Sequence, residues 1–262
     1  MGQRLAALFV ASAVVGLSMP AWAGRQSDGE RTSQKVLAIF EGHGDETIDA
    51  FLVRLRPAPL DEDSRAKVIA SLPKDGEVRP SRKDGEKLSA AQRILEYSAR
   101  AGSVTIKVID VDFAFVGLYH RAVVLVSARA LALLSADELA ALTAHEMGHD
   151  ADWDAYWTAI QRQDDERMRE LELKADGIAV LTLQHQGISP ERLTSAIRTT
   201  IRYNDWQDRS AGVLPQTGGT FGMADRYVWL PHRLAFIRAV AQLPWADSPT
   251  PVMAGTVSKG NQ

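Results

Sequence analysis

Residues 144–150 read "AHEMGHD" and place two histidines four positions apart, with a glutamate directly after the first. Residues four apart on an α-helix lie one turn above each other on the same face. His145 and His149 can therefore point both imidazoles at one ion, at about 2.0–2.1 Å if it is zinc. Glu146 follows about 100° further round the helix. That position suits the general base that acts on a zinc-bound water.

Two histidines four apart also occur as an ordinary surface pair on a polar helix face. The glutamate between them makes a chance occurrence much rarer and favours the metal site. A catalytic zinc needs three protein ligands and one open position. Because the chain has no cysteine, the third ligand must be His, Asp or Glu.

The segment "ELELKADGIAV", residues 170–180, supplies two acids that are again four apart. We expect Glu172 to complete the metal ligands. Asp176, one turn further on, is expected to accept a hydrogen bond from the second ring nitrogen of a ligand histidine, which fixes the orientation of that ring. The alternative is that both acids lie on a solvated helix face. Their position directly downstream of the two-histidine motif favours the metal site.

Small residues lie next to both the histidine pair and the acidic pair. Gly148 lies between the motif residues, and Ala175, Gly177 and Ala179 surround Asp176. Residues without large side chains let two helices approach closely. We therefore expect the two helices to pack directly on each other.

Hydrophobic periodicity and turn signals predict an α+β fold, mainly helical, with a small sheet beside the motif helix. "SADE" has the capping-box pattern, with Ser135 as N-cap and Glu138 three residues later, and it opens the motif helix. The predicted strands are 104–111 and 121–127, and the other predicted helices are 61–72, 87–102, 164–184, one after Pro190 and one from His232.

The first residues have the pattern of a signal peptide. A basic Arg4 precedes the apolar run 5–17, and "AWA" at 21–23 is a small-x-small cleavage site. The apolar run is short for a membrane span of about 20 residues. We expect cleavage near Ala23 and a periplasmic or secreted protein without stable membrane insertion. An uncleaved anchor is the alternative.

The rest of the chain is predicted to be one domain, residues 24–246, followed by a flexible tail, 247–262. Within it, 24–102 is an N-terminal helical part whose first residues, 24–35, are polar and expected to be loose. Residues 103–246 form the catalytic core. The net charge of −3 offers no basic surface for nucleic acid. The sequence does not indicate an oligomeric state.

Together these motifs resemble the gluzincin zinc metallopeptidases of the CAAX-prenyl-protease and HtpX type, the forty-eighth metallopeptidase family. The resemblance spans about residues 104–243 and rests on "SADELAALTAHEMGH", "ELELKAD" and "GISPERL". It implies a zincin-like domain, a Zn²⁺ cofactor and hydrolysis of polypeptides. It matches Glu172 to the third zinc ligand and Asp176 to the partner acid. In "PHRLAFIR", it matches His232 and Arg238 to a late histidine and an arginine six residues on.

Three further hypotheses concern how a substrate is held. Strand residues 123–127 are a candidate sheet edge for pairing with an extended substrate, and an internal strand is equally compatible. Residues 204–231, rich in glycine and containing Trp206, Phe221 and Tyr227, are a candidate lid. At its end, His232 is a candidate catalytic residue that either occupies the open metal position or donates to the oxyanion; a surface histidine is the alternative.

The sequence therefore predicts a zinc metalloendopeptidase that cleaves exported or envelope proteins with Glu146 as general base. An exported chaperone-like or binding module with a latent or structural zinc site is the alternative. A fourth protein ligand would favour that module, and an open position favours the enzyme.

Overall fold

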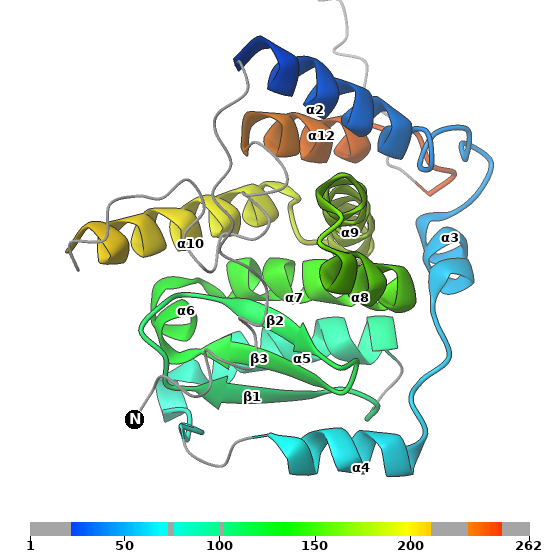
Figure 1. Ribbon diagram of the computed structural model, residues 1–262. Helices are drawn as coiled ribbons and strands as arrows, with labels where there is room; N and C mark the ends of the chain where they lie inside the picture. The colour runs from blue at the N-terminus through cyan, green and yellow to red at the C-terminus, as the bar shows by residue number, and fades with distance from the viewer. Residues whose placement is uncertain (1–21, 73–75, 100–101, 211–229, 248–262) are drawn as a thin grey trace, which may run out of the picture.

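A computed structural model describes residues 22–72, 76–99, 102–210 and 230–247, and the side chains from residue 29 onward within these ranges, except those of Ala99 and Arg209. Helices surround a small sheet (Figure 1). Along the chain, the elements are α2 (Trp22–Leu37), α3 (Ile48–Leu55), α4 (Glu62–Ser71), the 3₁₀ turn η1 (Arg82–Asp84), α5 (Gly85–Ala99), β1 (Thr105–Ile109), β2 (Val116–Tyr119), β3 (Val123–Ser127), α6 (Ala128–Leu133), α7 (Ala136–Asp150), α8 (Trp153–Arg162), α9 (Asp165–His185), α10 (Glu191–Ser210) and α12 (Leu230–Ala241). The predicted α+β class is confirmed.

The sheet has three strands in the order β1-β3-β2. β3 is parallel to β1, pairing Thr105 with Val123, and antiparallel to β2, pairing Leu118 with Val124. All five residues of β3 are buried. A central strand covered on both faces favours a continuous apolar run, which explains "VVLV" at residues 123–126. The prediction that 123–127 forms a sheet edge is therefore wrong, and the alternative, an internal strand, is confirmed. One edge of the described sheet is β2, a strand that the sequence analysis missed.

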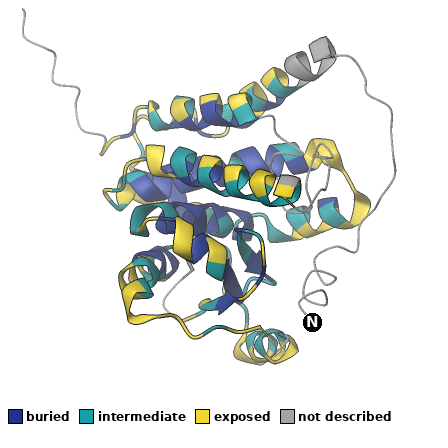
Figure 2. Ribbon diagram, turned by 90° about the vertical axis from the view of Figure 1, so that its left-hand side faces the viewer, coloured by how far each residue is buried: buried dark blue, intermediate teal, exposed yellow. Residues whose placement is uncertain are grey.

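The two faces of the sheet belong to different apolar clusters. Leu118, Val124 and Val126 join the main core, which also contains residues of α5, α7 and α9. Tyr119, Val123 and Leu125 face the other way and pack with α4 side chains such as Val68. Buried residues gather in the middle layers of the molecule, and exposed residues lie on the outward faces of the outer helices (Figure 2). The motif helix α7 is thus held between the sheet and α9.

The start of α7 follows the sequence prediction. The Ser135 hydroxyl accepts from the Glu138 N–H, and the Glu138 carboxylate accepts from the Ser135 N–H at 2.8 Å. This reciprocal pair satisfies two backbone donors that have no partner within the helix. The capping box is confirmed, and it fixes the first residue of the helix that carries the histidines.

α7 and α9 touch at two small residues. A Cβ built on Gly148 would lie 2.7 Å from both the Cα and the carbonyl oxygen of Ala175. The expected close approach is therefore present at this point. Gly177 serves a different neighbour, because a Cβ there would run into the ring of Phe40 rather than into α7.

Two segments differ from their predicted structure. Residues 24–35 were expected to be loose but belong to α2, which packs on α9 and α12 (Figure 1). Lys35 forms an ion pair with Glu170 of α9, and Val36 is buried. Tertiary contacts of this kind stabilise helices whose own propensity is modest.

The second is the predicted lid. Its first part, up to Ser210, belongs to α10, and Leu230 and Pro231 begin α12. The side-chain amide of Asn204 holds α10 against the chain before β2, accepting from the Ala114 N–H and donating to the Ala114 carbonyl oxygen. The remainder of the lid, 211–229, lies outside the described residues, as do the apolar run 5–17 and most of the tail.

Among the described residues, no helix combines the length and the apolar character needed to cross a bilayer.

The contact at Gly148 gives the first prediction. We expect Gly148→Ala to destabilise the protein by about 1–3 kcal/mol, because the new methyl meets backbone atoms that cannot move independently. Gly85→Ala is the matched control, since its Cβ would meet nothing within 4 Å. Urea unfolding at one pH measures both. Equal stability of the two variants would contradict the close approach.

Candidate metal centre

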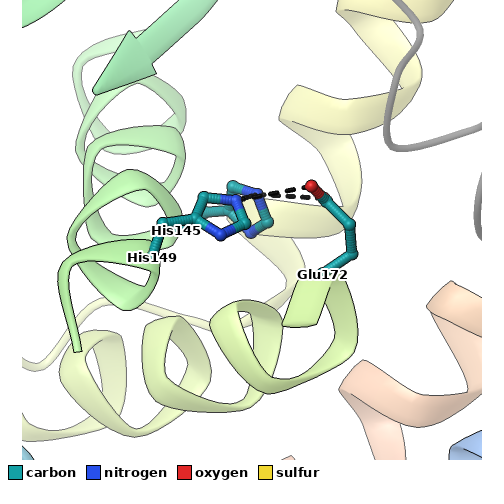
Figure 3. Close-up of side chains that lie close together, drawn as sticks. All are labelled: His145, His149 and Glu172. Carbon is teal, nitrogen blue, oxygen red and sulfur yellow. Dashed lines mark hydrogen bonds and ion pairs between the residues drawn. The ribbon is translucent and has the colours of Figure 1, made fainter. Parts of the chain in front are cut away.

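Three side chains from α7 and α9 converge on one point. His145, His149 and Glu172 each offer a ligand atom, and these atoms lie within 4.8 Å of one another (Figure 3). The two Nε2 atoms are 3.1 Å apart. Each histidine Nε2 faces one Glu172 oxygen, at 3.4 Å from His145 and 3.5 Å from His149. The two histidines come from successive turns of α7, and the glutamate comes from α9.

The residues present fit a metal ion. All three are almost completely buried. Glu172 Oε2 has no hydrogen-bond partner among the described residues. A buried carboxylate oxygen without a partner costs a large desolvation penalty, which an ion removes. Ligand atoms about 2.0–2.2 Å from a tetrahedral ion lie roughly 3.3–3.6 Å apart. The two Nε2 atoms, and each Nε2 with its nearer Glu172 oxygen, are separated by 3.1–3.5 Å, and one ligand atom from each residue can be chosen within 4.8 Å of the others.

Glu146 stands beside this group and does not belong to it. Its Oε2 accepts a hydrogen bond from the Leu118 N–H of β2 at 2.8 Å. The Glu146 side chain is only partly covered. Desolvation by the surrounding protein raises the pKa of its carboxyl to about 7. A carboxylate with such a pKa can both accept and return a proton near neutral pH.

Asp176 links the ligand group to α12. Its Oδ1 lies 2.8 Å from Nδ1 of His145, which leaves Nε2 of that ring for the ion. The guanidinium of Arg233 donates to both Asp176 oxygens, from Nε at 2.6 Å and from Nη2 at 2.8 Å. Asp176 and Arg233 are both buried. This two-point pairing fixes the carboxylate that orients the histidine.

Arg233 is the functional residue that the sequence analysis missed. The resemblance pointed to Arg238, which is exposed. Arg233 shares a helix face with Ile237 and Val240, four and seven residues on, and both of these are buried. An arginine in phase with the apolar face of a helix needs a buried acid partner. That signal was available in the sequence.

Burial and charge oppose each other in the pKa values of this group. Burial alone raises the pKa of Asp176, but Arg233 and His145 outweigh it and lower the value to about 2. The pKa of Glu172 is likewise lowered to about 2, because His149 and His145 outweigh burial. Burial lowers the pKa of His149 to about 4. Burial also lowers the pKa of His145, but Asp176 and Glu172 outweigh it and raise the value to about 10. Two anionic carboxylates and a neutral His149 suit a divalent cation, whereas His145 would have to give up a proton when the cation binds.

The structure does not bring His232 into the ligand group. Its ring packs against Gly29 of α2, where a side chain would collide with the imidazole. Arg233, the next residue, reaches Asp176 instead. His232 is therefore not one of the ligands in the described group, and its catalytic role stays a prediction.

With this geometry in hand, the comparison with known families is informative. Residues 90–168 match the model of peptidase family M48. This segment of the chain is similar to that family. It includes the last two thirds of α5, the three strands and the whole motif helix, and it covers less than half of the chain. No curated protein matches the chain.

The M48 match supports a peptidase, a hydrolase whose substrates would be polypeptides. M48 peptidases are metal-dependent, in keeping with the His145, His149 and Glu172 group. The matched segment ends before Glu172, Asp176 and Arg233. The contacts in the structure connect these three residues to the matched segment.

The second prediction tests the third ligand. Glu172→Gln should weaken zinc binding by about 100-fold or more, because it removes an anionic donor from the group. Glu170→Gln is the matched control on the same helix, since that carboxylate pairs with Lys35 and Arg167. Competition with a chromogenic chelator measures both affinities. Loss of the metal in the Glu170 variant alone would contradict the placement of Glu172.

The third prediction concerns metal-free protein. The raised pKa of Glu146 means that its contribution to stability is fully present below about pH 4.5 and is lost as pH rises through about 7. Glu146→Gln does not ionise. The free energy of unfolding of this variant, relative to that of the unmodified protein, should rise by about 2 kcal/mol between pH 5 and pH 8. This figure is reduced because the Glu146 side chain is partly exposed. Urea unfolding at both pH values measures the gain, and a pH-independent difference would contradict it.

Proposed function

We propose that the protein is a zinc-dependent metalloendopeptidase with His145, His149 and Glu172 as ligands and Glu146 as general base. The observation that carries the proposal is the convergence of three buried residues, with ligand atoms within 4.8 Å of one another, beside a carboxylate outside their group. The M48 match supports the peptidase class. Two imidazoles and one carboxylate favour zinc over magnesium or calcium, which prefer oxygen ligands in larger numbers.

When bound, zinc would supply the Lewis acidity that polarises the scissile carbonyl and makes water nucleophilic near neutral pH. The chain's own residues supply the proton transfer. Glu146 takes the proton of the attacking water and returns it to the leaving amine. The Leu118 N–H orients the Glu146 carboxylate. Asp176 holds the His145 ring, and Arg233 holds Asp176.

β2 takes over the role that the sequence analysis gave to β3. It is an edge strand of the described sheet, and its Leu118 contacts Glu146 directly. An extended polypeptide placed along the outer edge of β2 would pass the general base and the ligand group. Backbone hydrogen bonds to the strand would then hold substrates with little demand on their sequence.

The alternative, a binding module with a structural metal, is less compatible with the ligand set. Among the described residues, the group contains three protein donors. Structural zinc sites use four, whereas three leave the position that catalysis needs. We therefore favour the enzyme.

We further propose that the protein is exported and acts on exported or envelope polypeptides. The support is the signal-peptide pattern that ends at "AWA". N-terminal sequencing of the protein from its native host should find a first residue near Gly24. An intact Arg4 in the mature chain would contradict export by cleavage.

The fourth prediction tests the mechanism. Zinc-loaded protein should cleave casein, lose activity on chelation and regain it with zinc. Glu146→Gln should retain zinc and fold but lose activity by about 1,000-fold or more, because the substitution keeps the shape and removes the base. Metal analysis, circular dichroism and casein cleavage on the same samples give the result. Near-normal cleavage by the zinc-loaded variant would rule out Glu146 as the base.

A further inference from the structure

An aromatic cluster extends from the metal centre to the surface. It consists of His120, Trp153, Tyr156 and Trp157, from the β2–β3 loop and α8. The ring of Tyr156 lies 4.1 Å, centre to centre, from that of the ligand His149. Trp153 is 6.0 Å from Tyr156 and stacks on Trp157 at 6.0 Å with an interplanar angle of 11°. The rings form a continuous apolar path that starts at a metal ligand.

The outer end of the path is open. Trp157 is 38% exposed, although large aromatic side chains gain most from burial. His120 covers part of it, with its ring centre 5.2 Å from that of Trp157. Burial lowers the pKa of His120, so this ring is uncharged at neutral pH. The side chains of His120 and Trp157 therefore present uncharged rings beside β2.

The loop that carries His120 is held in an unusual backbone conformation. His120 and Arg121 have φ values of 44° and 62°, a region that residues other than glycine rarely adopt. Arg121 fixes the loop by pairing with Asp150, at the end of the motif helix, at 2.5 Å. It also donates to the Ala58 carbonyl oxygen at 2.8 Å. Positive φ at both central residues is what a two-residue hairpin turn requires, and the Ala122 N–H closes this turn by donating to the Tyr119 carbonyl oxygen at 3.1 Å.

We propose that the aromatic cluster is a specificity subsite that binds a bulky apolar side chain of the polypeptide substrate. This inference rests on the proposed peptidase function. β2 ends at Tyr119, directly before His120, so a peptide along its outer edge arrives at Trp153 and Trp157. The distance from His149 along the rings corresponds to at most about five residues of extended chain at roughly 3.3 Å each. The side chain that occupies the cluster therefore lies within about five residues of the scissile bond.

The test uses zinc-loaded protein and quenched fluorescent peptides in which Phe, Lys or Ala is placed in turn at each of the five positions on either side of the scissile bond. We expect Phe to be favoured over Ala at one position by about tenfold in kcat/KM. Trp157→Ala should reduce that ratio to below about threefold. Trp157→Tyr should restore most of it, because an aromatic ring is again present. Leu133→Ala, an equally exposed apolar side chain on α6, should leave the ratio unchanged.

The failure of this inference is separable from failure of the proposed function. If zinc-loaded protein cleaves neither casein nor any peptide, the function fails, and anisotropy of the labelled peptides on zinc-loaded Glu146→Gln still measures the preference for Phe. If cleavage occurs but Trp157→Ala leaves the Phe-to-Ala ratio unchanged, the subsite is overturned. An equal or greater preference for Lys at that position would overturn the apolar assignment, since the rings would then be binding a cation.

Discussion

The close packing of α7 on α9 is the contact on which the rest of the structure depends. Two ligands belong to one helix and the third to the other, so the ion can be held only if the helix axes come close enough. Gly148 and Ala175 permit this, because any Cβ at position 148 would collide with the backbone of α9. The sheet on one side of α7 and the helices α2 and α12 beyond α9 then keep the pair together (Figure 1).

The centre is stabilised by a series of buried charges that depend on one another. Arg233 holds Asp176, Asp176 holds His145, and His145 with His149 faces Glu172. Removing one member of such a series leaves an uncompensated charge in a medium of low polarity, which is costly. The ion is the natural completion of the series, because it neutralises Glu172, whose second oxygen is otherwise without a hydrogen-bond partner among the described residues. Folding and metal binding should therefore be coupled.

The residues that hold the metal and the residues that would meet the substrate lie in different parts of the structure. Ligands and their supporting residues lie on helices within the core, where packing fixes their rotamers. The general base and the aromatic cluster lie at the boundary between that core and the surface, next to an edge strand. Glu146 joins the two parts, since its carboxylate accepts from the Leu118 N–H of that strand. A substrate on the strand would thus meet a base whose position is already fixed.

The sequence by itself determined the local features. The spacing of His145, Glu146 and His149, the second pair at Glu172 and Asp176, and the capping box at Ser135 all depend on helix periodicity, which neighbouring residues set. The helices α4, α5, α7, α9 and α12 were predicted within a few residues of their ends for the same reason, whereas α2, α3, α6 and α8 were not predicted. Only the tertiary structure decided which strand is the edge, that residues 24–35 are helical, and that Arg233 rather than Arg238 reaches Asp176. Those outcomes depend on contacts between segments far apart in the chain, whose free energy no local pattern records.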